Sequence, residues 1–238
     1  MESWCVGYDG NDDVERHAGI DADSMAFRAH LRLNVVSDYI CPWCYIGFTR
    51  IEQLRSEFDI ELGACAYDLR PGTPPEGVSR AEAGKGRIYP PGYLENLRQT
   101  ALDSGIDMKR PPLIPNTRLA HEATEFAKEH GKLWEIHHAL FAAYFEQERD
   151  LGDIDVICDV CAGIGLDEAG LREALSSHRY AAEVQRQMDW SRANGVTGVP
   201  TVVFNDRFSL VGAQDYDVFL DVANRVVKLA AADARWSP

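Results

Sequence analysis

The sequence contains no run of 18 or more apolar residues, so it offers no candidate for a membrane-spanning helix. Positive charge is also scarce, since 24 Lys and Arg stand against 38 Asp and Glu and the formal net charge is −14 at pH 7. Binding to nucleic acid or to an anionic membrane depends on clustered Lys and Arg, so we expect neither kind of partner. The first 30 residues hold seven acidic and two basic residues and lack the apolar stretch of a signal peptide. We therefore expect a cytoplasmic protein.

Cysteine is scarce as well. Six cysteines in 238 residues are too few for a disulfide scaffold in a chain of this length. In a reducing compartment, paired cysteines are more often catalytic or metal-binding than structural. Two pairs have the C-x-x-C spacing, Cys41 with Cys44 and Cys158 with Cys161. Each pair needs its own interpretation.

The pattern of apolar residues predicts a strand, a helix and a second strand after an acidic tail over residues 1–29. Residues 31–37 have the pattern of a buried strand, the residues after Cys44 are helical to about Phe58, and residues 60–67 form another apolar strand. This order predicts two parallel strands joined by a right-handed crossover.

A long helical segment separates this unit from the remaining strands. Residues 70–115 are rich in Pro and Gly, with one helix expected near residues 93–104, and residues 116–195 are helical almost throughout. A hairpin follows, in which residues 201–204 and 207–211 flank a two-residue turn. A last amphipathic helix is expected over about residues 216–231.

Without its insertion, this order is the connectivity of a thioredoxin fold. The expected fold class is therefore α/β, a thioredoxin fold with a large inserted all-helical domain. The predicted organisation is an acidic N-terminal tail at 1–29, a thioredoxin-fold domain at 30–70 and 190–238, and an inserted helical domain with its connections at 71–189.

Cys41 and Cys44 are the expected redox pair. Cys41 follows a strand and precedes Pro42, and proline suits the first position of a helix because its missing N–H would be unpaired there. Cys41 would then be the N-cap, where free N–H groups and the helix dipole favour a thiolate. Cys44, one turn further along, would resolve the mixed disulfide formed at Cys41. The alternative is that both cysteines only pack as small apolar side chains.

Pro200 is the second candidate feature. It precedes an expected strand, where proline is tolerated only at the start or edge. Most X–Pro bonds are trans, so the residues alone leave the isomer of Val199–Pro200 open.

Three segments resemble the DsbA family, specifically its FrnE-like branch. They are Ser37-Asp-Tyr-Ile-Cys-Pro-Trp-Cys-Tyr-Ile-Gly47, the helical insertion, and Gly198-Val-Pro-Thr201 leading to Val211-Gly-Ala-Gln214. The resemblance implies a cis Val199–Pro200 bond beside the active disulfide, and substrate binding by the Val199 backbone. The chain departs from DsbA at Trp43, where DsbA has a His within its C-x-x-C. Because Trp43 cannot carry a positive charge, we do not extend the role of a periplasmic oxidase to this chain.

The resemblance implies a thiol–disulfide oxidoreductase that acts on protein or small thiol and disulfide substrates. No cofactor beyond the redox-active cysteines is expected, and glutathione is a possible partner. Two alternatives remain. One is a glutathione-dependent isomerase or transferase of the 2-hydroxychromene-2-carboxylate isomerase or kappa type, related proteins that typically have Ser where this chain has Cys41. The other is a non-catalytic protein whose thiols bind metal.

Cys158 and Cys161 are interpreted as packing residues. With Ile154 and Ile157 they follow the i, i+3, i+4, i+7 spacing of one apolar helix face. An auxiliary redox or metal pair is the alternative. The histidines form no metal-binding signature, and adjacent residues such as His137 and His138 are expected to be surface or packing residues. No metal site is predicted, and the oligomeric state is left open.

Overall fold

The structure is a computed structural model that describes residues 28–86 and 88–236. The predicted acidic tail, with Cys5, lies almost wholly outside these residues. The elements in chain order are β1 (Ala29–Ser37), α1 (Pro42–Leu54), β2 (Phe58–Ala66), β3 (Val78–Ser79), α2 (Arg80–Ala83), α3 (Tyr93–Asp103), β4 (Leu113–Ile114), α4 (Arg118–Glu129), α5 (Leu133–Phe145), α6 (Ile154–Gly163), α7 (Glu168–Ser176), α8 (Ala181–Ala193), β5 (Thr201–Phe204), β6 (Phe208–Val211) and α9 (Tyr216–Trp236).

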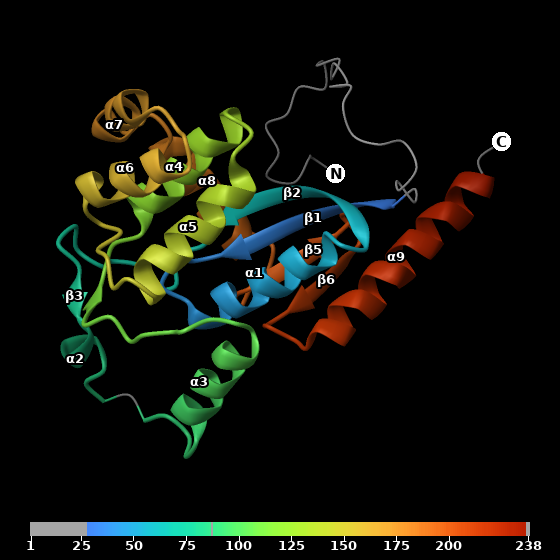
Figure 1. The fold of residues 1–238 in the computed structure, drawn as a ribbon, viewed down its shortest axis with the longest axis horizontal. Coiled ribbons are helices and arrows are strands. Elements are labelled where there is room, and N and C mark those ends of the chain that lie inside the picture. Colours follow the sequence, from blue (N-terminus) through green and yellow to red (C-terminus); the bar gives the residue numbers. More distant parts are fainter. Residues whose placement is uncertain (1–27, 87, 237–238) are drawn as a thin grey trace.

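The thioredoxin-type sheet has four strands in the order β2-β1-β5-β6. β1 pairs with β2 in parallel, which confirms the predicted strand–helix–strand unit, and β5 pairs antiparallel with both β1 and β6. Leu33 lies opposite Phe204 across the centre of the sheet. In Figure 1 these strands lie together although the whole helical insertion separates β2 from β5 in the sequence.

Helices α1 and α9 pack on one face of this sheet (Figure 1). Alternate residues of the strands point to that face, as the two-residue period of a strand requires. Leu33 and Phe204 contribute from the sheet, Ile51 from α1, and Phe219 from α9, and all four are fully buried. This cluster fixes α1, and with it the Cys41–Cys44 pair, against the sheet.

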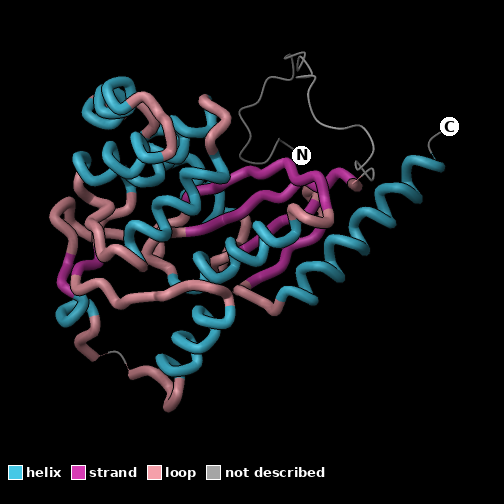
Figure 2. The backbone as a smooth tube through the Cα atoms, viewed as in Figure 1, coloured by secondary structure: helices cyan, strands magenta, loops and turns pink. Residues whose placement is uncertain are grey.

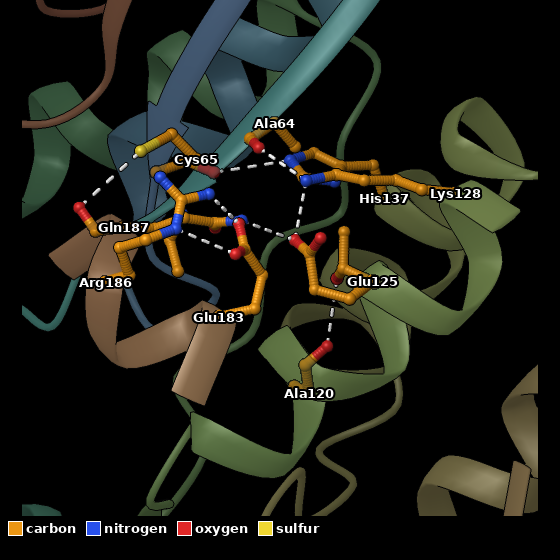
Figure 3. A network of polar contacts seen from close by, with 12 residues as sticks. Ala64, Cys65, Ala120, Glu125, Lys128, His137, Glu183, Arg186 and Gln187 are labelled. Atoms are coloured by element: carbon orange, nitrogen blue, oxygen red, sulfur yellow. Dashed lines mark hydrogen bonds and ion pairs between the residues drawn. The ribbon is translucent and has the colours of Figure 1, made fainter. Parts of the chain in front are cut away.

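The inserted helices pack against the edge strand β2 at its C-terminal end. Gln187 on α8 accepts a hydrogen bond from the backbone N–H of Ala66 at 2.9 Å, and Lys128 on α4 donates to the carbonyl of Ala64 at 2.8 Å. Figure 3 shows this contact, with Glu125 accepting hydrogen bonds from both Lys128 and Gln187. Side chains of the insertion thus satisfy backbone groups of a strand edge that would otherwise be open to pairing.

Most predicted elements are confirmed, with differences at their ends. The tube in Figure 2 shows the short strands β3 and β4 inside the insertion, so that domain is helical apart from a two-stranded sheet. α8 ends at Ala193 and continues beyond residue 189, where the sequence analysis ends the insertion. The expectation that α1 runs to about Phe58 was wrong, because α1 ends at Leu54 and Phe58 begins β2.

Two further boundaries differ in the C-terminal part. β6 begins at Phe208 rather than at residue 207, because Arg207 belongs to the turn and its N–H bonds to the carbonyl of Phe204 at 3.0 Å. α9 continues to Trp236, past the predicted end at residue 231, since no Gly or Pro interrupts the chain there. Within the part of the chain that the structure describes, no helix has both the length and the apolar character needed to cross a membrane.

Candidate active site

Cys41 is the N-cap of α1, as predicted. Its backbone is extended, with φ −89° and ψ 112°, and Pro42 opens the helix. The N–H of Cys44 donates to the carbonyl of Cys41 at 3.0 Å, which closes the first turn. The Cys41 thiol donates to the carbonyl of Val199 at 3.6 Å, so the nucleophile predicted from one end of the chain contacts the turn predicted near the other.

Cys44 lies deeper in the protein than Cys41 and is 1 % exposed. Burial raises the pKa of the Cys44 thiol well above its ordinary value, and the neighbouring Cys41 sulfur raises it further. The pair is therefore asymmetric, because the inner thiol is held in its protonated form. Such an inner thiol becomes a nucleophile only when a base removes its proton, as the resolving step requires.

Pro200 packs against α1 directly behind this pair. The Val199–Pro200 peptide bond is cis in the structure. A β-carbon at Gly47 would lie 2.9 Å from Cγ of Pro200, closer than side-chain contacts allow, so only glycine lets the helix approach this ring. Arg50, also on α1, donates hydrogen bonds to the carbonyls of Ala213 and Gln214, which holds the segment that follows β6.

Asp38 is a fully buried carboxylate three residues before Cys41. Its oxygens accept hydrogen bonds from the N–H of Leu69 at 2.7 Å, the N–H of Ile40 at 3.3 Å and the hydroxyl of Thr117 at 2.9 Å. Burial raises the pKa of Asp38 to about 6, although these three hydrogen bonds oppose the rise. Asp38 thus joins the strand that leads to Cys41 with the end of β2 and the start of α4.

A second buried polar group links β1 to the insertion. His137 on α5 lies 3.3 Å from the hydroxyl of Ser37 and 3.0 Å from that of Tyr39, and the Tyr39 hydroxyl lies 2.6 Å from that of Thr124. Burial lowers the pKa of His137 to about 3, so this histidine is neutral at pH 7. A neutral ring can accept from Ser37 and donate to Tyr39, which leaves Tyr39 free to donate to Thr124. His137 is therefore a packing residue, as predicted, but one that carries specific hydrogen bonds.

A cavity of about 480 Å³ opens beside Cys41. Pro42, Trp43 and Val199 line it together with Cys41, so these predicted site residues meet in one place. Pro200 and Cys44 are not among the lining residues. Most of the remaining lining comes from the Pro- and Gly-rich part of the insertion, which the sequence analysis treated as connection.

Aromatic side chains form one side of the cavity. The indole N–H of Trp43 donates to the hydroxyl of Tyr93 at 2.9 Å, and the two rings meet edge to face with centroids 6.4 Å apart. Tyr89 stacks on Tyr93 with centroids 5.1 Å apart. Trp43, the residue at which the chain departs from DsbA, therefore connects the C-x-x-C segment to α3.

Cys158 and Cys161 lie away from this cavity. Both are 0 % exposed on α6 and belong to the apolar cluster of the helical domain. Burial raises the pKa of both thiols, in the case of Cys161 to about 12. This placement agrees with the packing interpretation.

The sequence analysis missed the cavity residues that the insertion supplies, among them Arg80, Tyr93 and Lys109. Arg80 and Lys109 lie in segments without clear periodicity, and Tyr93 begins a predicted helix whose pattern did not mark it as a site residue. Asp38 was part of the motif that carried the family resemblance, but its spacing from Cys41 gave no sign of its burial.

A thioredoxin-type sheet, a C-x-x-C at the N-terminus of α1 and a Val–Pro turn against the first cysteine together define a DsbA-type thioredoxin-fold protein. Residues 32–223 match the model of the DSBA-like thioredoxin domain, and the chain belongs to that family.

One sequence relative and two solved structures are similar to this chain. It is 30 % identical over 194 residues to the uncharacterized protein YwbO of Bacillus subtilis (strain 168), covering 79 % of this chain and 94 % of YwbO. The crystal structure of a probable DsbA oxidoreductase from Streptomyces coelicolor superposes with a TM-score of 0.75 at 26 % identity, over 83 % of this chain and 90 % of that one. The structure of a 2-hydroxychromene-2-carboxylate isomerase gives a TM-score of 0.65 at 18 % identity, over 87 % and 100 %. The last comparison shows a shared fold alone.

Proposed function

We propose that this protein is a thiol–disulfide oxidoreductase in which Cys41 is the nucleophile and Cys44 the resolving cysteine. The observation that carries the proposal is the asymmetry of the pair. Both cysteines are buried, but Cys41, at 4 % exposed, caps a helix and lines the cavity, whereas Cys44 does not line it and has a raised pKa. A pair of cysteines that only packed would have no reason to place one sulfur in the wall of a cavity.

The cycle follows from this geometry. The Cys41 thiolate attacks a substrate disulfide, forms a mixed disulfide and expels one substrate thiolate. Cys44 then loses its proton and attacks the Cys41 sulfur, which releases the second substrate thiolate and leaves a Cys41–Cys44 disulfide. In the reverse direction a substrate thiolate attacks the oxidised Cys41. The Val199 carbonyl, 3.6 Å from the Cys41 sulfur, supports a role for this backbone in holding the substrate at the site of attack.

Two variants test the mechanism. With dithiothreitol as reductant, the protein should catalyse insulin disulfide reduction, and Cys41→Ser should abolish that activity. Cys44→Ser should form a mixed disulfide at Cys41 that persists, detectable by mass spectrometry, because the resolving thiol is gone. Full turnover in Cys41→Ser would refute the proposal.

The glutathione-dependent isomerase or transferase alternative makes a different prediction for Cys44. Such a reaction needs one hydroxyl or thiol to stabilise the glutathione thiolate and no resolving cysteine, so Cys44→Ser would be fully active. Equilibrating the protein in glutathione buffers and measuring the Cys41–Cys44 reduction potential also separates an oxidase from a reductase. We propose a cytoplasmic site of action, with glutathione as a candidate partner, and cell fractionation tests the location.

A further inference from the structure

The cavity beside Cys41 has a charge opposite to that of the whole molecule. Five cationic side chains line it, namely Arg70, Arg80, Arg98, Lys109 and Arg110. Its described lining includes no Asp or Glu, although the chain as a whole carries 38 acidic and 24 basic residues. An electropositive cavity in an acidic protein is a local arrangement that composition alone does not produce.

Much of this charge is not neutralised by carboxylates. The Arg80 guanidinium donates to the carbonyl of Pro111 at 2.5 Å and to the hydroxyl of Tyr144 at 3.0 Å, and both acceptors are uncharged. Lys109 and Arg110 are exposed, and neither forms an ion pair with any described residue.

Arg98 differs, because Glu95 lies 2.8 Å from its guanidinium and cancels part of its charge. The net positive charge of the cavity therefore depends mainly on Arg80, Lys109 and Arg110. Lys109 and Arg110 are the two that can be replaced without disturbing a described side-chain contact.

The remaining walls limit the size and chemistry of a ligand. Tyr89, Tyr93 and Trp43 present aromatic surface, and Leu94 and Met108 add apolar surface. A volume of about 480 Å³ falls within the range of sites for small molecules. Cys41 lies in the same wall, so a ligand in the cavity can place a sulfur against the nucleophile.

We infer that the cavity selects low-molecular-weight disulfides that carry two negative charges beside an apolar or planar part. The inference rests on the proposed function, since it names the substrate class of the same cysteines. The Cys41 thiolate attacks one sulfur of the disulfide RSSR, the S–S bond breaks and RS⁻ leaves. Cys44 then attacks Cys41 and a second RS⁻ leaves, so the protein dithiol loses two electrons and two protons while RSSR is reduced to two thiols.

Two chromogenic disulfides test the charge preference in single-turnover reactions. One is 5,5′-dithiobis(2-nitrobenzoate), which is planar and dianionic, and the other is 4,4′-dithiodipyridine, which is planar and neutral at pH 7. The readout is the ratio of their rate constants with pre-reduced full-length protein, which cancels effects on Cys41 itself. All proteins carry Cys5→Ser, so that this thiol outside the described residues adds no signal.

The informative variant is Lys109→Gln with Arg110→Gln. The matched control is Arg225→Gln with Lys228→Gln, which removes the same charge at two exposed positions of α9 outside the cavity. We expect the cavity variant to lower the ratio of anionic to neutral rate about five- to tenfold, and the control to change it less than about twofold. Salt at about 0.5 M should lower the ratio of the unmodified protein in the same direction.

Equal ratios in the cavity variant and the control, or a ratio that salt does not change, would overturn the inference. Failure of the proposed function gives a different result. In that case the neutral probe reacts no faster than with Cys41→Ser, or only one equivalent of chromophore is released. If two equivalents of chromophore are released and the rate constants do not depend on the charge of the probe, the oxidoreductase proposal stands and only the selectivity for anions is refuted.

Discussion

Gly47 and Pro200 are in contact at a distance that admits no side chain at position 47, since a β-carbon there would lie 2.9 Å from Cγ of Pro200. Gly47 is in the middle of α1, where glycine costs about 1 kcal/mol relative to alanine. The sequence thus retains a poor helix former at the point where the helix of the reactive cysteines meets the Val199–Pro200 turn.

Gly47→Ala should therefore destabilise the protein by about 1–3 kcal/mol, because overpacking outweighs the gain in helix propensity. The matched control is Gly163→Ala at the end of α6, where a β-carbon would meet nothing within 4 Å. That change should be neutral or slightly stabilising. Urea denaturation of both variants measures the difference, and insulin reduction should fall only in Gly47→Ala. Equal stability of the two variants would contradict the contact.

Cys158 and Cys161 should act as packing residues although they share the spacing of the redox pair. Replacing both with Ala removes small buried groups, so the free energy of unfolding should fall by about 1–3 kcal/mol while insulin reduction persists. Replacing both with Ser should cost more, because each hydroxyl would be buried and need a partner. A stable Ala variant with slow reoxidation of Cys41–Cys44 would instead indicate a redox relay.

His137 should make the protein sensitive to acid. Its pKa is about 3 in the folded protein against an ordinary value of 6.5, so the unfolded chain binds the proton first as the pH falls. This contribution to stability is present in full above pH 6.5 and is lost as the pH falls towards 3. Between pH 6.5 and 5 the loss should be about 2 kcal/mol. His137→Gln should lower the free energy of unfolding at neutral pH, because it breaks the contacts with Ser37 and Tyr39. The difference in free energy of unfolding between wild type and variant should then shrink by about 2 kcal/mol as the pH falls from 6.5 to 5. A gap that stays constant would show that His137 is not held neutral.

Asp38 should have the opposite pH signature. Its pKa is about 6 when folded against an ordinary value of 3.8, so the folded protein binds the proton first and the contribution of Asp38 to stability falls as the pH rises from 4 to 6. The free energy of unfolding of the wild type, measured relative to Asp38→Asn, should fall by about 2 kcal/mol across that range. Chemical denaturation at half-unit steps of pH tests this. An advantage that grows with pH would mean that hydrogen bonds to the carboxylate outweigh its burial.

The sequence predicted those parts of the site that local patterns encode. A proline after Cys41 and apolar strands around it were enough to locate the cysteine pair, whereas the place of the Val199–Pro200 turn beside it came from the resemblance to the DsbA family. The cationic wall could not be predicted in this way, because Arg80, Lys109 and Arg110 come from aperiodic segments that meet only in the folded chain. His137 illustrates the same limit, since a histidine on a helix gives no sign that its partners lie about 100 residues earlier.

The pairing of Leu33 with Phe204 also constrains how the chain folds. These neighbours are separated by the entire insertion, so the central pair of strands closes a very long loop and adds high-separation contacts to the fold. During synthesis from the N-terminus, β1, α1 and β2 leave the ribosome well before the strand that completes their sheet. The helices of the insertion are made in between and can pack on β2 first. Cys41 is therefore synthesised early, but the cavity beside it is complete only after Val199 and the strand β5 that follows it have emerged.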